Sequence, residues 1–286
     1  MLRTLLKTTI AAAALGCALA SPALAQSTPT PSPYTPTGFW DTYFAGGWSL
    51  TLGAQATVGP SYEGASNMGF LAAPMVSLGR SGAGPVFTSR NDNPGLAVFD
   101  TGNFQIGPVA KILYERTDSA SNDLKGLKDV PWGGELGLFM NYYPSDWLRL
   151  RAEVREGIRA YHGVVADLSA DAFYDITPTW RISGGPRISA ASEGYYEAYY
   201  GVSLAESLAS GLDIYHPDGG GIKSVGVGGA VTWKTTDKIT TSAFAEYSRL
   251  TGPAADSSLV RERGNDNQLL LGVSATYRFD FTVPGM

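Results

Sequence analysis

Cysteine and histidine are almost missing from this sequence of 286 residues. Its one cysteine, Cys17, lies near the N-terminus, and its two histidines, His162 and His216, are far apart. A single cysteine forms no internal disulfide, and this spacing offers no zinc-type ligand set. No nucleophile pattern such as G-x-S-x-G accompanies either histidine. We therefore expect no catalytic residues, no metal site and no cofactor.

Long apolar runs and excess positive charge are missing as well. No stretch after the N-terminal region approaches the roughly 18 uninterrupted apolar residues of a membrane-spanning helix. Lys and Arg number 21 against 26 Asp and Glu, so the chain is acidic. This balance argues against nucleic acid as a partner. A helical membrane protein and a nucleic-acid-binding protein are therefore not expected.

The N-terminus has the pattern of a secretory signal peptide. Arg3 and Lys7 precede an apolar run over residues 9–20, which is too short to span a membrane. Ala23-Leu24-Ala25 then forms an A-x-A cleavage site. We therefore expect residues 1–25 to be a cleaved signal peptide.

A proline-rich segment follows the expected cleavage site. Residues 27–37 read STPTPSPYTPT, a composition that favours extended polyproline II over helix or sheet. We expect residues 26–46 to form a periplasmic N-terminal spacer. Two interpretations stay open, a disordered spacer and a tether that reaches the cell-wall layer.

The last strand of the sequence alternates apolar and polar residues over its whole length. From Leu269 to Phe281 every second residue is apolar, which is longer than the typical strand of about 5–6 residues. A tilted strand that crosses a bilayer takes about 9–11 residues or slightly more. Tyr277, Phe279 and Phe281 crowd its end, as expected at a membrane interface. This strand therefore indicates an outer-membrane protein.

The same alternation recurs through residues 47–281 and predicts a single antiparallel transmembrane β-barrel. The expected strands are 48–58, 70–79, 85–90, 95–100, 103–116, 132–143, 147–160, 163–175, 179–190, 196–204, 223–234, 239–250 and 269–281. This count is odd, whereas bacterial single-chain barrels have an even number, so we expect about 12 strands within roughly 10–14. One of the thirteen predicted strands is therefore expected to be wrong. The weakest are the short pair near 85–100 and the segment 196–204. Residues 282–286 form a short C-terminal extension.

The connections between the expected strands are of two kinds. Short turns are typical of the periplasmic side of such barrels, and longer polar loops of the extracellular side. The short turns lie at 144–146, 176–178 and 235–238, and the longer loops at 59–68, 117–131 and 251–266.

Charged residues alternate with apolar ones along 147–160. Charges on the lipid side of a barrel cost about 2–4 kcal/mol each near the midplane, so we place the charged face in the lumen. The two following strands add carboxylates and then guanidinium groups to the same face. The predicted lumen charges are Arg149, Arg151, Glu153, Arg155, Arg159, Asp167, Asp171, Arg181 and Arg187.

A hairpin tip near Tyr161 predicts the partners of these charges. Arg155 would lie opposite Asp167 and Arg151 opposite Asp171, with Asp167 between Arg155 and Arg187. Two interpretations stay open. The charges form a constriction that selects small solutes, or they form a salt-bridged network that fills a narrow lumen.

Several segments resemble motifs of the MipA/OmpV family of outer-membrane proteins. The most specific match is 249–260, and the residues 264–268 and 277–279 that follow also resemble the family. Further matches are 60–64 and 199–202. The resemblance covers essentially the whole mature chain. Two departures are the extension beyond Phe281 and Ser257-Ser258, where the family loop has serine followed by proline.

Family resemblance implies a barrel in the outer membrane of a Gram-negative bacterium, surrounded by outer-membrane lipid. Its named member, the MltA-interacting protein, scaffolds a lytic transglycosylase and a murein synthase. Other members are described as porin-like or adhesive. We therefore expect a non-catalytic scaffold that contacts cell-wall enzymes through the spacer, the short turns and loop 205–222. The alternatives are a narrow channel for small polar solutes and a surface adhesin.

Overall fold

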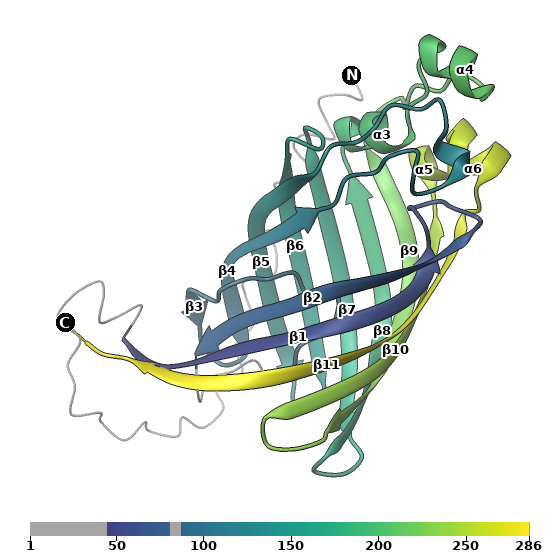
Figure 1. Cartoon of the computed structure of the whole chain (residues 1–286). Helices are drawn as coiled ribbons and strands as arrows, with labels where there is room; N and C mark the ends of the chain where they lie inside the picture. Colours follow the sequence, from purple (N-terminus) through teal and green to yellow (C-terminus); the bar gives the residue numbers. More distant parts are fainter. Residues whose placement is uncertain (1–44, 81–86, 286) are drawn as a thin grey trace. The chain divides into compact units, whose positions relative to one another are not determined.

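Residues 45–80 and 87–285 are described by the computed structural model, in which eleven strands form one antiparallel sheet (Figure 1). The strands are β1 (Gly46–Pro60), β2 (Met68–Arg80), β3 (Phe99–Asp100), β4 (Phe104–Leu113), β5 (Gly133–Ser145), β6 (Leu148–Ile158), β7 (Val164–Asp175), β8 (Trp180–Ala191), β9 (Gly221–Lys234), β10 (Ile239–Leu250) and β11 (Asn267–Val283). Strands β3 to β11 follow one another in the sheet, so every connection among them is a hairpin. The predicted all-β antiparallel barrel class is confirmed.

The first and last strands of the chain, β1 and β11, pair with each other over most of their length. Gly46 lies opposite Val283, and the register continues to Val58 opposite Leu271. Such pairing joins the two ends of the chain in an up-and-down barrel. The ladder ends at β2 on one side and at β3 on the other, and residues 81–86 between them lie outside the described residues.

The prediction of a strand at 196–204 is wrong. Helix α3 (Glu193–Tyr200) covers most of it, and α4 (Leu204–Ser210) begins where it ends. Apolar and aromatic residues at Tyr195, Tyr196 and Tyr200 are buried on one side of α3. Spacings of one, four and five residues place side chains together on a helix, whereas a strand would divide them between its faces.

The short pair of strands expected near 85–100 is also largely wrong. Residues 87–90 form no strand, and 85–86 lie outside the described residues. Within 95–100 only β3 is a strand, although Leu96 N–H and Val98 N–H donate to the carbonyls of Pro108 and Ile106 at 3.1 and 3.0 Å. This segment therefore follows β4 irregularly.

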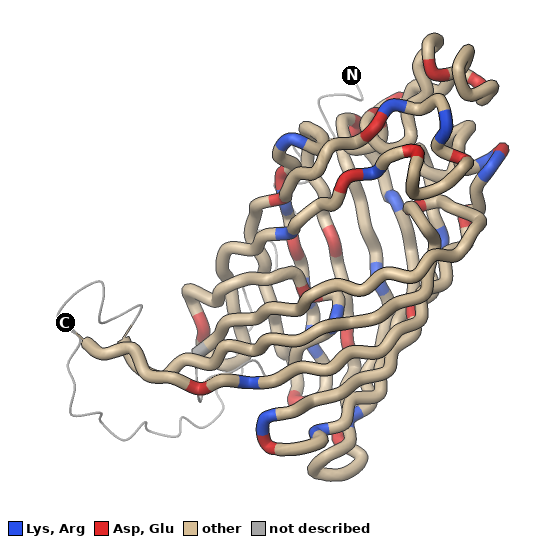
Figure 2. The backbone as a smooth tube through the Cα atoms, in the orientation of Figure 1, with Lys and Arg blue, Asp and Glu red and all other residues tan. Residues whose placement is uncertain are grey.

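The outer face of the sheet is apolar, and the inner face carries the charges. On β6, Leu150 is 41% exposed and Val154 47%, whereas Arg149 and Arg155 are buried. This inverts the pattern of a water-soluble sheet, as lipid around a barrel requires. Figure 2 shows charged residues along β5 to β8 and few on β1 and β2.

Large aromatic residues collect near the ends of strands beside the short turns. Trp147, Tyr174, Trp180 and Trp233 are all exposed there. Trp180 stacks on Trp233 with ring centroids 5.6 Å apart. Exposed tryptophan and tyrosine mark the boundary between lipid and water, so these residues form a membrane-interface belt.

The two kinds of connection lie at opposite ends of the strands. The turns that follow β5, β7 and β9 share one end, because these strands run in the same direction. The longer connections 61–67, 114–132, 192–220 and 251–266 share the other end. Loop 205–222 is thus at the long-loop end, and its expected place beside the short turns is wrong.

Short helices occur only in these long connections within the described part of the chain. They are the 3₁₀ helix η1 (Asn122–Leu124), α3, α4, α5 (Gly252–Asp256) and α6 (Ser258–Arg263). In α4, Ser203 and Glu206 form a capping box that satisfies the first turn. Among the described residues, no helix combines the length and apolar character needed to cross a membrane.

The expected signal peptide, 1–25, lies outside the described residues, as does the expected spacer, 26–46, except for Ala45 and Gly46. Both stay predictions.

Candidate functional site

Strand β6 supplies the centre of a charged network on the inner face of the sheet. Arg149, Arg151, Glu153 and Arg155 alternate with apolar residues and are all buried. Burial of four charged side chains on one strand lowers the stability of the fold unless each is paired. The partners of these side chains therefore determine whether the lumen is filled.

Arg155 is the centre of the network nearer the long loops. Its Nε donates to Glu135 on β5 at 2.6 Å, and its two Nη atoms contact Glu153 and Asp167. The Tyr161 hydroxyl donates to the other oxygen of Glu135 at 2.8 Å. Three carboxylates on three strands therefore surround one guanidinium group.

Arg149 is the centre of the network nearer the short turns. Its Nη2 lies 2.7 Å from Asp171 on β7, and Arg187 on β8 contacts the second oxygen of Asp171. Arg151, between the two centres, donates to Glu153 at 2.7 Å and to Asn141 at 2.9 Å. The charges of β5 to β8 thus form two ion-paired groups, one around Arg149 and one around Arg151 and Arg155.

The register of β6 and β7 differs by two residues from the expected one. Arg149 lies opposite Asp171 and Glu153 opposite Asp167, so both predicted pairs, Arg155 with Asp167 and Arg151 with Asp171, are wrong as directly opposed residues. The hairpin is centred on Ala160 because Gly157 N–H donates to Gly163 O at 2.8 Å. Arg155 still reaches Asp167, but diagonally.

Three predicted lumen arginines lie differently from the expectation. Arg187 contacts Asp171 instead of Asp167. Arg181 pairs with Asp175 at 2.6 Å, with the Asp175 side chain half exposed, and its guanidinium lies 5.2 Å from the ring centre of Phe173. Arg159 is exposed at the hairpin tip with φ 73°, and its guanidinium lies 4.1 Å from the ring centre of Trp132.

Residues 87–93, which we call the lumen segment, complete the network and were missed by the sequence analysis. Asp92 accepts two hydrogen bonds from Arg149, at 2.6 and 2.9 Å. Asn93 donates to Glu153 at 2.7 Å, and Asn91 contacts Glu246 on β10. The lumen segment therefore bridges β6 and β10, which are separated by three strands in the sheet.

One apolar contact anchors the start of the lumen segment. Phe87 stacks on Phe173 of β7 with centroids 4.7 Å apart, and its carbonyl accepts from the Tyr143 hydroxyl at 3.1 Å. The signal available in the sequence was the polar run Arg90-Asn91-Asp92-Asn93 followed by Pro94, which is unlike a membrane-facing strand.

The long connections pack on one another as a cap at their end of the sheet. Two apolar clusters hold the cap together, one around Tyr196, Tyr200 and Val260 and one around Tyr62, Val202 and Leu259. The first cluster also includes residues of β7, β8 and β10, so the cap is attached to the strands. Figure 1 shows α3, α5 and α6 gathered at this end.

The segments that carry the family resemblance meet in this cap. Gly64 N–H donates to the Gln268 side chain at 3.0 Å, and Asn265 N–H donates to the Gly64 carbonyl at 2.8 Å. The Ser257 hydroxyl donates to the Tyr200 carbonyl at 2.7 Å. Motifs separated by up to two hundred residues therefore form one folded unit.

Glu63 connects the cap to the sheet. Its carboxylate lies 2.8 Å from the Lys223 ammonium on β9 and accepts from the Tyr195 hydroxyl at 2.5 Å. Burial alone would raise the pKa of Glu63, but Lys223 and the hydrogen bond from Tyr195 lower it below its usual value. Burial and the charge of Glu63 raise the pKa of Tyr195 well above 10.0, so Tyr195 keeps its proton.

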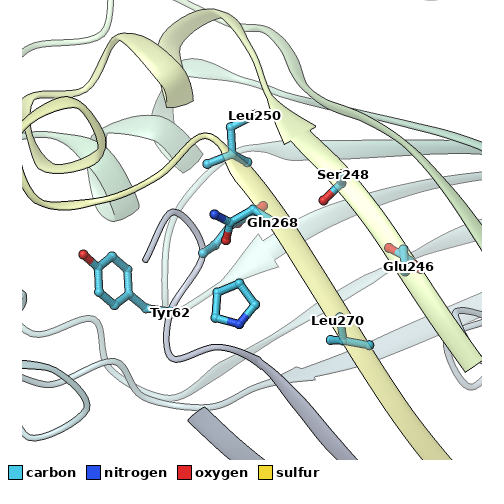
Figure 3. A pocket seen from close by; sticks show the side chains of 8 residues that line it. Tyr62, Glu246, Ser248, Leu250, Gln268 and Leu270 are labelled. Atoms are coloured by element: carbon cyan, nitrogen blue, oxygen red, sulfur yellow. The ribbon is translucent and has the colours of Figure 1, made fainter. Parts of the chain in front are cut away.

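A cavity of about 180 Å³ lies between the first long loop and strands β10 and β11. Figure 3 shows Glu246 and Ser248 on β10 and Gln268 and Leu270 on β11 along its wall, with Tyr62 at the loop side. Pro60, Glu63 and Leu250 complete the lining. Glu63 and Glu246 are already bound by Lys223 and Asn91, so the cavity holds no free carboxylate among its lining residues.

Neither histidine forms a catalytic arrangement with the groups around it. His162 is exposed at the β6–β7 tip, and His216 lies 3.6 Å from Glu197 with both side chains exposed. Within residues 45–80 and 87–285, no group of three His, Cys, Asp or Glu side chains is placed to hold a metal ion.

Together, a curled antiparallel sheet with an apolar outer face, an aromatic belt and an ion-paired inner face defines an outer-membrane β-barrel protein. The chain belongs to the family described as "MltA-interacting protein MipA", which matches residues 52–279. The family resemblance and the outer-membrane location predicted from the sequence are confirmed.

Several solved structures are similar to this chain. They include the N-terminal β-barrel domain of Pseudomonas aeruginosa OprF (TM-score 0.26, 12% identity, 62% of this chain and 98% of that chain). Others are Ail of Yersinia pestis (0.24, 11%, 82% and 100%) and the Pseudomonas putida toluene transporter TodX (0.33, 11%, 83% and 89%). At these scores and identities they indicate nothing about function. No curated protein is similar enough in sequence to count as a relative.

Proposed function

We propose that this protein is a non-catalytic outer-membrane scaffold that holds periplasmic murein-remodelling enzymes. The observation that carries the proposal is the occupied lumen. Arg149 and Arg155 are buried in ion pairs, and the lumen segment bridges β6 and β10 across the inner face. A barrel filled in this way is suited to a structural role more than to free diffusion.

The family name supports the choice of partner. A protein described as MltA-interacting acts by binding another protein, and partners in the periplasm meet the short-turn end of a barrel. We therefore place the contact on the short turns and the spacer 26–46. Loop 205–222 is left out because it lies at the other end.

A pull-down joined to a conductance measurement tests the proposal. The detergent-extracted barrel is incubated with its own periplasmic fraction, and the same preparation is reconstituted in planar bilayers. Recovery of a lytic transglycosylase or a murein synthase without stable conductance supports the scaffold. Steady, salt-dependent conductance without a cell-wall partner overturns it.

Two variants locate the contact. Deletion of Gln26–Thr37 removes most of the spacer, and Asp237→Lys reverses a charge in the β9–β10 turn. We expect either change to weaken binding of the recovered enzyme about tenfold, which corresponds to about 1.4 kcal/mol. The matched control is Asp118→Lys in a long loop, and weakening by this control instead would contradict a periplasmic contact.

A narrow channel for small polar solutes is the second candidate, and the polar nature of the lumen segment favours it. Except for Phe87 and the contact of Arg90 with the Phe244 ring, this segment is held by hydrogen bonds and ion pairs, which water can replace. Reversal of a wall charge by Arg155→Glu then changes ion selectivity in bilayers. Unchanged selectivity rejects the channel.

A further inference from the structure

At one position in the network, two positive side chains of the strands contact a single negative one. Arg149 on β6 and Arg187 on β8 both contact Asp171 on β7, so two guanidinium groups share one carboxylate. Arg149 and Asp171 are 1% exposed. Among the described residues, Asp171 is the carboxylate on a strand that pairs with either of these two arginines.

Asp92 of the lumen segment supplies a second carboxylate. Its two oxygens accept from both Nη atoms of Arg149, at 2.6 and 2.9 Å, and one of them lies 3.5 Å from Arg151 Nε. This paired arrangement is the one by which arginine binds carboxylate and phosphate ligands. Asp92 therefore occupies the position that an oxyanion would take.

The same two arginines carry unused hydrogen-bond donors. The Nε atoms of Arg149 and Arg187 are buried, and neither has a hydrogen-bond partner among the described residues. A buried N–H without an acceptor is unfavourable, so these donors stabilise any additional oxygen that reaches them. The side chains of Asp92 and Arg187 are each 16% exposed, so the position is in contact with water.

We propose that Arg149 and Arg187 form a binding site for a small carboxylate- or phosphate-bearing solute, and that Asp92 occupies the Arg149 side of this site as an internal competitor. A solute that enters from the short-turn end replaces the Asp92 carboxylate on Arg149 and extends toward Arg187, which contacts the same Asp171 carboxylate as Arg149. Asp171 stays between the two guanidinium groups. The lumen segment then loses its strongest contact with β6.

Competition from Asp92 sets the affinity that is measured. A site filled by its own chain most of the time binds added ligand weakly, because the apparent dissociation constant increases as the vacant fraction falls. Removal of the competing carboxylate therefore tightens binding, although it removes an ion pair.

Equilibrium binding of radiolabelled inorganic phosphate to the detergent-solubilised barrel tests this prediction. We expect Asp92→Asn to bind phosphate at least about tenfold more tightly than the unaltered protein. Arg187→Gln, added to Asp92→Asn, removes the gain, and unlabelled succinate competes. The matched control is Asp175→Asn, which makes the same change in the Arg181 pair and leaves binding unaltered. Equal phosphate binding by the unaltered protein and Asp92→Asn overturns the proposal.

A cross-linking experiment tests displacement directly in a protein with intact arginines. Apart from Cys17 in the expected signal peptide, the chain has no cysteine, so Asn91→Cys with Glu246→Cys forms a single defined pair. These two side chains are in contact. We expect phosphate to slow formation of their disulfide about threefold or more relative to sodium chloride of equal ionic strength. An equal rate in both salts means that no oxyanion displaces Asp92, and it rejects the proposal.

Discussion

Gly64 shows how one residue in the cap is constrained by both backbone and space. Its φ is +99°, a region that side-chain-bearing residues rarely adopt. A Cβ at this position would lie 2.7 Å from Val260 Cγ2, and its N–H and carbonyl bind Gln268 and Asn265. The first loop therefore joins the last one through a position that only glycine fits.

Gly64→Ala is predicted to destabilise the cap. The strained backbone alone costs about 1–3 kcal/mol, and the close approach to Val260 adds to it. We expect faster protease cleavage in the long loops and a lower denaturant midpoint, measured by the mobility shift of folded barrel on gels. Gly79→Ala is the control, because nothing lies within 4 Å of the added Cβ. Equal effects of both substitutions would contradict a specific role for Gly64.

Among the elements, β6 and its neighbours show the difference between buried and exposed ion pairs. Arg155 is 0% exposed and contacts Glu135, Glu153 and Asp167, whereas the Arg181 pair with Asp175 is half exposed. Loss of one member of a buried set leaves the others without compensation. Water screens the exposed pair and takes its place when it breaks.

Arg155→Leu is therefore predicted to destabilise the barrel by about 3–5 kcal/mol, because Glu135 and Asp167 lose their ion-pair partner and Glu153 keeps only Arg151. Arg181→Leu is predicted to cost at most about 1 kcal/mol. Urea unfolding in detergent, followed by tryptophan fluorescence, measures both. A result in which Arg181→Leu is the more damaging change would show that the network does not stabilise the fold.

The sequence predicted the long strands well because lipid outside and charge inside impose a strict period of two. The register of β6 and β7 was missed by two residues, since it depends on how Ala160 and Gly163 shape the hairpin tip and not on the alternation. Helix α3 was missed because Tyr195 to Val202 alternates partly like a strand. The lumen segment was missed for another reason: Asn91 meets Glu246, which is 155 residues away, and no local pattern reports such a contact.

For the molecule as a whole, the lumen is occupied at two levels along the strands. The cap joins four long connections at one end, and the lumen segment with its ion pairs lies on the inner face below it. The only direct ion pair that we find between the first loop and β9, within the described residues, is that of Glu63 with Lys223. The part of the cap's attachment to the sheet that the first loop makes to β9 by an ion pair therefore depends on the protonation of Glu63.

Acid is predicted to loosen the cap. Lys223 and Tyr195 lower the pKa of Glu63 in the folded protein, so its contribution to stability is fully present above the ordinary value of 4.5. That contribution declines as the pH falls below 4.5 and is lost once the pH passes the folded pKa. Hydrogen exchange of loop 61–67 between pH 7 and pH 3 measures it, and exchange is expected to accelerate beyond its intrinsic pH dependence. Glu63→Gln should show loose exchange at every pH, whereas the exposed Glu193→Gln should behave like the unaltered protein. If Glu63→Gln keeps the protection of the unaltered protein at neutral pH, the cap is held by its apolar clusters alone, and the ion pair has no part in closing the lumen.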